Sequence, residues 1–298
     1  MSKSKSNIQY LFVLIVVFAI AGTISLISHD NEKKITPNNN DNMLVVHFLD
    51  VGQGDCEFIE LPNSQCMLID ASTKEYGDDI VEAIKGYGYS EIDYVVATHP
   101  HADHIGGMSE VIDSFDIGKI YMPRTSSNSK SFEGLLTSIS NKNLSINTAK
   151  TGTTIYSDNG INIEIMSPIS SFYEETNDYS AVVKLEYGES SFLFMGDAEK
   201  PVENELIEKY GYDLDVDVLK AGHHGSRYSS STEFLDYVTP EYTVISCAKD
   251  NSYGHPHSET IERLNNVNTQ IFRTYELGNI TVSCDDNDSF EISYDWGI

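Results

Sequence analysis

Basic side chains are scarce in this chain of 298 residues. The sequence holds 19 Lys and Arg against 46 Asp and Glu, which gives a formal net charge of −27 at pH 7. Its only adjacent pair of basic residues is Lys33-Lys34. A protein that binds nucleic acid without sequence preference usually carries a basic patch that faces the phosphates. The composition therefore argues against a general nucleic-acid-binding module, although a bound cation can offset such repulsion locally.

Cysteine is equally scarce, with four residues and no Cys-x-x-Cys pair. Structural zinc sites of the finger or ribbon type use such pairs, so the spacing argues against one. Cys56 and Cys66 flank a turn at residues 62–64. Their positions leave two alternatives open, a cross-strand disulfide or two buried free thiols.

The N-terminal residues differ from the rest of the chain. Lys3 and Lys5 precede an uncharged apolar run at residues 10–27, which as a helix would span about 27 Å, close to the thickness of a bilayer core. We expect a signal anchor at residues 1–28, a polar linker at residues 29–42 and one domain at residues 43–298. Basic residues before the run put the N-terminus in the cytoplasm, so the domain would lie outside a single-pass membrane anchor. The alternative is a cleaved signal peptide and a secreted protein.

The domain has the composition and length of one sizeable α/β unit, with 40% hydrophobic and 22% charged residues in the chain. Short apolar runs bounded by turn residues predict strands, among them 43–49, 66–69, 94–97 and 216–219. Apolar residues at helical spacing predict helices at 78–87, 199–210 and 232–238. Strands followed by helices in both halves predict two sheets face to face with helices outside. Other α/β layer arrangements fit the same pattern.

The densest chemical signal is a cluster of four polar residues that directly follows the predicted strand 94–97. His99, His101, Asp103 and His104 lie within six positions of one another. Neutral imidazole nitrogen and carboxylate oxygen are the ligands that Zn²⁺, Mn²⁺ and Fe²⁺ prefer. We expect His99 and His101 to bind one ion, and Asp103 and His104 to bind a second.

Three further segments carry candidate ligands. Asp197 follows the predicted strand 191–195, and is either a metal ligand or the N-cap of the helix at 199–210. His223 and His224 follow the predicted strand 216–219. One of them would complete the second metal site and the other would face the substrate, and the sequence leaves open which. His255 is either an oxyanion donor, an outer-sphere partner of the metal site, or a structural residue.

These segments, in their order along the chain, resemble the metallo-β-lactamase superfamily. The flanking residues 48–55, 176–180, 194–197, 223–226 and 251–256 are similar to the C-terminal hydrolase domain of the ComEC-type DNA-uptake family, and more distantly to phosphorylcholine esterases. The resemblance implies a four-layer αββα sandwich that binds two divalent metal ions, Zn²⁺ or Mn²⁺. It also implies that Asp197 bridges both ions and that a metal-activated hydroxide attacks the substrate.

The resemblance assigns roles to individual residues. The metal ligands are expected among His99, His101, Asp103, His104, Asp197, His223 and His224. Catalytic roles fall to Asp103, His224 and His255, and substrate contacts to Asn177, Ser226 and His255. Many members of the superfamily carry another His between the first motif and the bridging Asp, but no His occurs here between His104 and His223. Asn177 or Asp178 would then offer an oxygen ligand, which favours Mn²⁺.

The expected function is that of a membrane-tethered extracellular phosphodiesterase or nuclease of the ComEC-like type. Two alternatives act on other substrates: a phosphoester hydrolase of the cell envelope, similar to phosphorylcholine esterases, and a β-lactam or thioester hydrolase. A third is a non-catalytic surface protein with a stabilising metal site, which the nearly complete ligand set disfavours. The expected partners are a phosphoester substrate and the membrane, and no protein partner can be inferred.

Overall fold

A computed structural model describes residues 42–296. The predicted anchor at residues 1–28 and the linker up to residue 41 lie outside this range. Among the described residues, no helix is long and apolar enough to cross a membrane.

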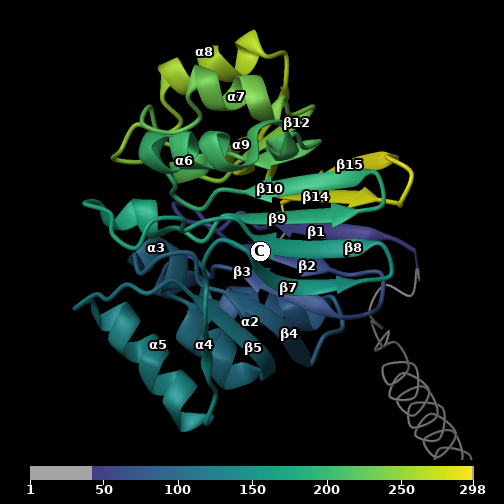
Figure 1. Cartoon of the computed structure of the whole chain (residues 1–298). Coiled ribbons are helices and arrows are strands. Elements are labelled where there is room, and N and C mark those ends of the chain that lie inside the picture. The colour runs from purple at the N-terminus through teal and green to yellow at the C-terminus, as the bar shows by residue number, and fades with distance from the viewer. Residues whose placement is uncertain (1–41, 297–298) are drawn as a thin grey trace, which may run out of the picture. The chain divides into compact units, whose positions relative to one another are not determined.

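The described chain forms two sheets that pack face to face (Figure 1). The first sheet has the strand order β15-β14-β1-β2-β3-β4-β5-β6 and the second β13-β12-β11-β10-β9-β8-β7. The strands of the first sheet are β1 (Leu44–Phe48), β2 (Glu57–Glu60), β3 (Cys66–Ile69), β4 (Glu91–Val96), β5 (Asp116–Met122), β6 (Ile146–Thr148), β14 (Asn279–Cys284) and β15 (Phe290–Asp295). Those of the second sheet are β7 (Thr153–Asp158), β8 (Ile161–Ile165), β9 (Val183–Tyr187), β10 (Ser190–Phe194), β11 (Val218–Lys220), β12 (Tyr242–Ile245) and β13 (Gln270–Arg273).

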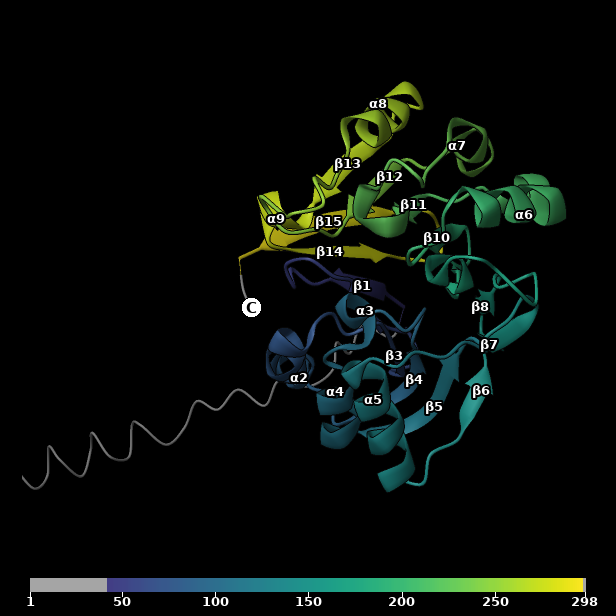
Figure 2. The ribbon, with the colours of Figure 1, turned by 90° about the vertical axis from the view of Figure 1, so that its left-hand side faces the viewer.

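Helices cover the outer face of each sheet (Figures 1 and 2). The α-helices are α2 (Gly77–Gly86), α3 (Ala102–Ile105), α4 (Met108–Ser114), α5 (Lys130–Asn141), α6 (Lys200–Tyr210), α7 (Thr232–Val238), α8 (Ser258–Asn266) and α9 (Thr274–Leu277). Single 3-10 turns are η1 (Lys74–Tyr76), η2 (Thr176–Tyr179), η3 (Gly211–Leu214) and η4 (Gly222–Gly225).

Successive side chains of a strand point to opposite faces of its sheet, and this alternation produces three hydrophobic layers. On β4, Val96 faces the other sheet and packs in a core with Phe192 of β10. Its neighbour Val95 points the opposite way and packs with Val111 of α4, as the two-residue repeat of a strand requires. Leu193 of β10 likewise packs among the helices of the second sheet. The predicted two-sheet sandwich with helices outside is therefore confirmed.

Parallel strands of both sheets end near the same region of the molecule. In the first sheet β3, β4, β5 and β6 run parallel to one another. In the second, β10, β11, β12 and β13 do so. In sheets of this kind ligands bind at the carboxyl ends of the strands. The His-rich segment follows β4, Asp197 follows β10 and the His pair follows β11.

The cysteine alternatives are resolved in favour of free thiols. All four cysteines are buried and unpaired. Cys66 stands opposite Glu60 in the β2–β3 ladder rather than opposite Cys56. A cross-strand disulfide would need the two cysteines to face each other.

Candidate metal centre

The first group of candidate ligands gathers where β4 ends. Ligand atoms of His99, His101 and Asp197 all lie within 4.8 Å of one another. Nε2 of His99 lies 3.0 Å from Nδ1 of His101 and 3.5 Å from Oδ2 of Asp197. Burial lowers the pKa of His99 well below its usual value. Its imidazole is therefore neutral, which is the form that binds a metal.

The second group lies on the other side of Asp197. Asp103, His104 and His224 offer ligand atoms that also fall within 4.8 Å of one another. Nε2 of His224 lies 3.6 Å from Oδ2 of Asp103. The structure thus brings together the residues that the sequence predicts for each ion. It also selects His224 rather than His223 for the second group.

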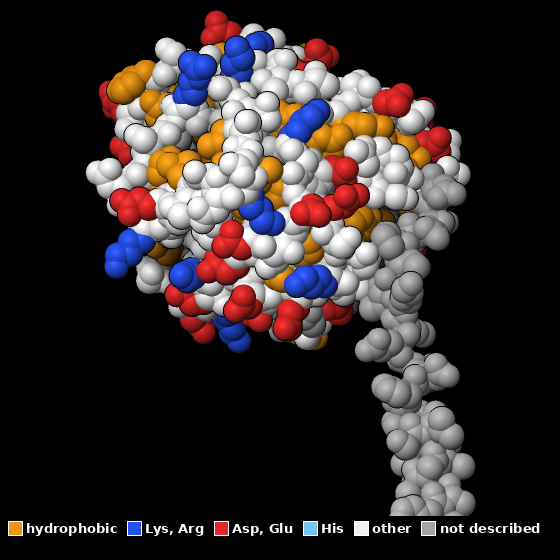
Figure 3. All heavy atoms as spheres, turned by 90° about the horizontal axis from the view of Figure 1, so that it is seen from below, with side chains coloured by type: hydrophobic (Ala, Val, Ile, Leu, Met, Phe, Trp, Pro, Cys, Tyr) orange, Lys and Arg blue, Asp and Glu red, His pale blue; other side chains and the backbone are white. Residues whose placement is uncertain are grey.

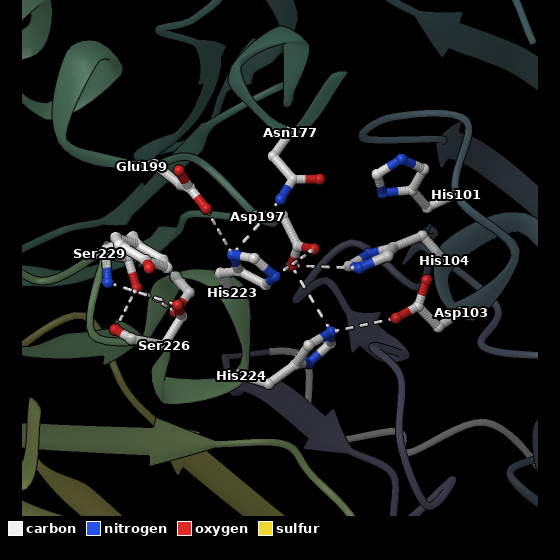
Figure 4. A network of polar contacts seen from close by, with 12 residues as sticks. His101, Asp103, His104, Asn177, Asp197, Glu199, His223, His224, Ser226 and Ser229 are labelled. Atoms are coloured by element: carbon white, nitrogen blue, oxygen red, sulfur yellow. Dashed lines mark hydrogen bonds and ion pairs between the residues drawn. The ribbon is translucent and has the colours of Figure 1, made fainter. Parts of the chain in front are cut away.

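Asp197 lies between the two groups and turns one oxygen to each (Figure 4). Its Oδ1 lies 3.1 Å from Nε2 of His104 and 3.6 Å from Nε2 of His224. Its Oδ2 lies 3.5 Å from Nε2 of His99. The N-cap of α6 is Glu199, whose own side chain makes no capping hydrogen bond. Asp197 therefore has the position of a bridging carboxylate and not of a helix cap.

Several atoms in this cluster lack hydrogen-bond partners among the described residues. Nε2 of His104, Nε2 of His224 and Oδ1 of Asp197 are all buried and unsatisfied. Leaving buried polar groups unpaired costs about 1–3 kcal/mol each, so native structures rarely do so without a reason. The three atoms converge, and nitrogen with carboxylate oxygen is the donor set of divalent transition metals. The residues fit a pair of metal ions.

An open cleft of about 360 Å³ leads to the cluster. Its walls include Asp103, Asn177, Asp197, His224 and His255. A substrate entering this cleft would reach both ligand groups.

His223 has a position different from that of its neighbour. Its Nδ1 lies 2.8 Å from Oε1 of Glu199 and 3.4 Å from Nδ2 of Asn177. Its Nε2 points toward Oδ2 of Asp197 at 3.7 Å. His223 and His224 both have left-handed backbone conformations, with φ of 47° and 54°. Two consecutive non-glycine residues in this region store strain of the kind found at functional sites.

The predicted substrate-contact residues divide into two kinds. Asn177 and His255 line the cleft, and Oδ1 of Asn177 and Nδ1 of His255 are buried without a hydrogen-bond partner among the described residues. Burial and the nearby His223 lower the pKa of His255 to about 4.

Two other candidates are not brought to the cleft. The side chain of Ser226 is 1% exposed, and its Oγ accepts a hydrogen bond from the backbone N–H of Tyr228 at 3.3 Å. Asp178 accepts one from the backbone N–H of Glu199 at 3.2 Å, at the start of α6. Of the two oxygen ligands proposed for the missing His, only Asn177 therefore faces the cluster.

Two buried carboxylates support the cluster and were missed in the sequence. Oδ2 of Asp70 lies 2.6 Å from Nδ1 of His104. Oδ1 of Asp55 lies 3.1 Å from Nδ1 of His224, and its Oδ2 accepts a hydrogen bond from Nζ of Lys220 at 2.8 Å. Such outer partners fix the orientation of a ligating imidazole. Asp70 directly follows the predicted strand 66–69, and this position is the sequence feature that could have identified it.

Comparison with known proteins agrees with this arrangement. The family model described as the Metallo-beta-lactamase superfamily matches residues 49–249. Over 252 residues the chain is 27% identical to ComE operon protein 3 of Bacillus subtilis, covering 79% of this chain and 32% of that protein. Over 234 residues it is 27% identical to Competence protein ComA of Neisseria gonorrhoeae, covering 78% and 31%. The chain spans about a third of the length of these relatives.

Solved structures share the fold at low sequence identity. CmlA, a diiron beta-hydroxylase from Streptomyces venezuelae, aligns with a TM-score of 0.55 and 15% identity over 80% of this chain and 53% of its own. The metallo-beta-lactamase fold protein YhfI of Bacillus subtilis aligns with a TM-score of 0.54 and 9% identity over 82% and 100%. At these identities the likeness concerns the fold alone.

Proposed function

We propose, from the premise that the chain belongs to the metallo-β-lactamase superfamily, that this metal-dependent hydrolase cleaves phosphodiester bonds. The observation that carries the proposal is the position of Asp197 between two ligand groups, one oxygen toward each. A pair of ions about 3.5–4 Å apart is the arrangement that clamps the attacking and leaving oxygens of an in-line displacement. Similarity to competence proteins supports a phosphodiester over a lactam.

Bound divalent ions would lower the pKa of a water molecule and neutralise the charge that develops on the phosphoryl group. The ligands for this pair are those of the two groups, His99, His101 and Asp197 on one side and Asp103, His104 and His224 on the other. Asn177 offers the first group an amide oxygen in place of an imidazole. This oxygen favours Mn²⁺ over Zn²⁺ at that position.

The side chains around the cleft have complementary tasks. In the metal-free protein, burial raises the pKa of Asp103, but the nearby His224 and the charge of His104 outweigh it and hold the pKa below its ordinary value. The ionised carboxylate of Asp103 therefore accepts a hydrogen bond from the attacking water and orients it. His255, neutral at pH 7 because of its lowered pKa, contacts a phosphoryl oxygen as a hydrogen-bond donor rather than as a charge.

A phosphoester of the cell envelope is the second candidate substrate, and the charge of the chain favours it. The net charge of −27 repels a long polyanion. On the face toward α4 and α5, acidic and basic side chains are interspersed and form no basic patch (Figure 3). A short envelope ester would feel this repulsion less than a nucleic acid would.

We also propose that residues 1–28 tether the protein to the membrane, with the hydrolase domain outside. The support is the apolar run at residues 10–27 behind Lys3 and Lys5. Protease added to intact cells should then remove the domain. A soluble form that begins between Gly22 and Asn31 would instead indicate a cleaved signal peptide.

Metal analysis followed by a substrate panel tests the activity. The full-length chain should carry close to two transition-metal ions. It should hydrolyse a bis-aryl phosphodiester reporter, whereas His101→Ala should lose that activity. Parallel assays with a single-stranded oligonucleotide, a phosphorylcholine ester and a chromogenic lactam separate the substrate classes. Hydrolysis of the lactam alone would contradict the proposal.

A further inference from the structure

A second cavity lies beside the metal cleft and has no part in the proposed metal site. This groove of about 360 Å³ is lined by residues that include Arg124, Thr148, Lys150, Thr151, Ser170 and Tyr179. The turn η2 connects it to the cleft, because Tyr179 lines the groove and Asn177, two residues earlier, lines the cleft. A chain-like ligand in the cleft would have to cross only this short turn to reach the groove.

The sheet topology gives the distance between the two sites. Arg124 follows β5 and Lys150 follows β6, and both strands run parallel to β4, which ends at the His-rich segment. Neighbouring strands lie about 4.8 Å apart, so the ends of β4 and β6 are separated by roughly 10 Å. A separation of this order is short enough for adjacent nucleotides of one strand to occupy both sites.

The groove is basic in a strongly acidic protein. None of the residues that line it is Asp or Glu. Within residues 42–296 the Arg124 side chain makes one polar contact, with Oγ1 of Thr148 at 3.4 Å. In the same range neither Arg124 nor Lys150 forms an ion pair. Lys209 adds a third cation, since its Nζ lies 2.5 Å from Oγ1 of Thr151.

The carboxylate of Glu205, at the edge of the groove, already accepts hydrogen bonds from neighbouring side chains. Glu205 accepts hydrogen bonds from the hydroxyls of Ser170 and Tyr173, the latter at 2.5 Å. Its charge reduces the positive potential at one end of the groove but leaves Arg124 and Lys150 without a partner. Arg124 and Lys150 thus remain exposed and without an ion-pair partner among the described residues.

Exposed aromatic side chains mark both ends of this path. Phe172 directly follows the two serines that line the groove and is 72% exposed. Tyr253 lines the metal cleft and is 62% exposed. Single-stranded nucleic acid is typically bound by cations that follow its backbone together with aromatic rings on which the bases stack.

We propose that the groove is a subsite for single-stranded nucleic acid, next to the site at which the phosphodiester is cleaved. Arg124 and Lys150 contact backbone phosphates, and Phe172 and Tyr253 stack against bases. The inference rests on the proposed phosphodiesterase function and adds the substrate class and its direction on the surface. The positive charges of Arg124 and Lys150 offset the repulsion between the acidic protein and a nucleic acid, but only for the part of the strand that lies in the groove.

The test compares the full-length wild type with the double variant Arg124→Ala/Lys150→Ala and with Lys85→Ala as the matched control. Lys85 is an exposed cation on α2 and lines neither cavity. Anisotropy of a labelled single-stranded oligonucleotide gives the Kd in metal-free protein over a series of salt concentrations. The double variant should bind roughly tenfold more weakly at low salt. Its slope of log affinity against log salt should be shallower by about 1.4, the loss expected for two phosphate contacts.

Activity provides the second measurement. Hydrolysis of the small reporter should keep its kcat and KM in the double variant, whereas KM for the oligonucleotide should rise. Phe172→Ala should weaken oligonucleotide binding about fivefold or more, because a stacked base is lost, and should leave binding of inorganic polyphosphate unchanged. Unchanged melting temperatures show that these exposed substitutions leave the fold intact.

Two results would overturn the inference. One is oligonucleotide binding by the double variant equal to that of Lys85→Ala. The other is polyphosphate or a glycerol-phosphate polymer competing as well as the oligonucleotide, together with a neutral Phe172→Ala, which would make the groove a general polyanion site. Failure of the wild type to hydrolyse the small reporter would instead contradict the proposed function, independently of the binding result.

Discussion

Asp70 accepts a hydrogen bond of 2.6 Å from Nδ1 of His104, and both side chains are fully buried. The same carboxylate accepts hydrogen bonds from the backbone N–H and the hydroxyl of Thr98, at 2.8 and 2.5 Å. Asp70 therefore ties the end of β3 to the beginning of the His-rich segment. Because Nδ1 of His104 is engaged, its Nε2 faces Asp197.

The first prediction is that Asp70→Asn weakens metal binding by about 10–100-fold, the usual effect of losing such a partner. An amide accepts a hydrogen bond at only one of its two polar atoms, so either His104 or Thr98 loses its acceptor. Titration of the metal-free protein with Mn²⁺ and Zn²⁺ measures the change. Asp93→Asn is the matched control, because Asp93 binds Gln65 and the backbone of Cys66 away from the cluster. Equal affinities in the two variants would contradict an orienting role for Asp70.

The second prediction concerns Asp197 and its position between the two ligand groups. Asp197→Ala should lose metal from both groups at once, because its two oxygens face different imidazoles. Asp197→Asn should retain some metal but little activity, since the bridging charge is gone. Metal content by mass spectrometry and reporter hydrolysis measure the two effects.

Asp178→Ala is the control for helix capping. Asp178 accepts a hydrogen bond at the start of α6, so this variant should melt at a lower temperature with its metal content intact. An Asp197→Ala protein that behaved in the same way would show that Asp197 only supports the helix.

Local patterns in the sequence predict the elements and the ligands that follow them. The predicted strand 66–69 and helix 232–238 match β3 and α7 residue for residue. His99 and Asp197 were found because a buried strand that stops at a polar residue is visible within a few positions. The short helix α3 was missed, since it is formed by Ala102–Ile105, inside the ligand motif itself.

Contacts between distant segments could not be predicted in this way. Lys220 and Asp55 are 165 positions apart and meet only because β11 and the segment after β1 lie near each other in the sandwich. The choice between His223 and His224 depends on two left-handed backbone conformations, which neither residue type specifies. The basic groove likewise combines the ends of β5 and β6 with the loop before η2.

The third prediction concerns the buried ion pair between Lys220 and Asp55, each with a side chain 1% exposed. Lys220→Met leaves Oδ2 of Asp55 without its cationic partner in the interior, which should lower the free energy of unfolding by about 3–5 kcal/mol. Burial opposes ionisation of Asp55, but Lys220 and His224 lower its pKa to about 2. Chemical unfolding in urea measures the loss. The double variant Lys220→Met/Asp55→Asn should regain part of it, and a double variant less stable than Lys220→Met alone would contradict this account.

The last prediction is a pH dependence that comes from Glu203 on α6. Its side chain is fully buried and accepts hydrogen bonds from the backbone N–H groups of Ser230 and Ser231. Burial raises the pKa of Glu203 from 4.5 to about 7, despite those hydrogen bonds. The folded state therefore keeps its proton between pH 4.5 and 7 while the unfolded state releases it, and stability falls as the pH rises through this window.

Glu203→Gln removes the titrating group and isolates its effect. The free energy of unfolding of the wild type, minus that of the variant, should be largest near pH 4.5. It should fall by up to roughly 3 kcal/mol by pH 7, at 1.36 kcal/mol for each unit of pKa shift, and stay level above pH 8. Urea unfolding of metal-free protein at each pH measures this difference, in which titrations common to both proteins, such as that of Asp178, cancel. A difference that does not change with pH would mean that Glu203 is ionised in the folded protein throughout, and that the two backbone N–H groups outweigh its burial.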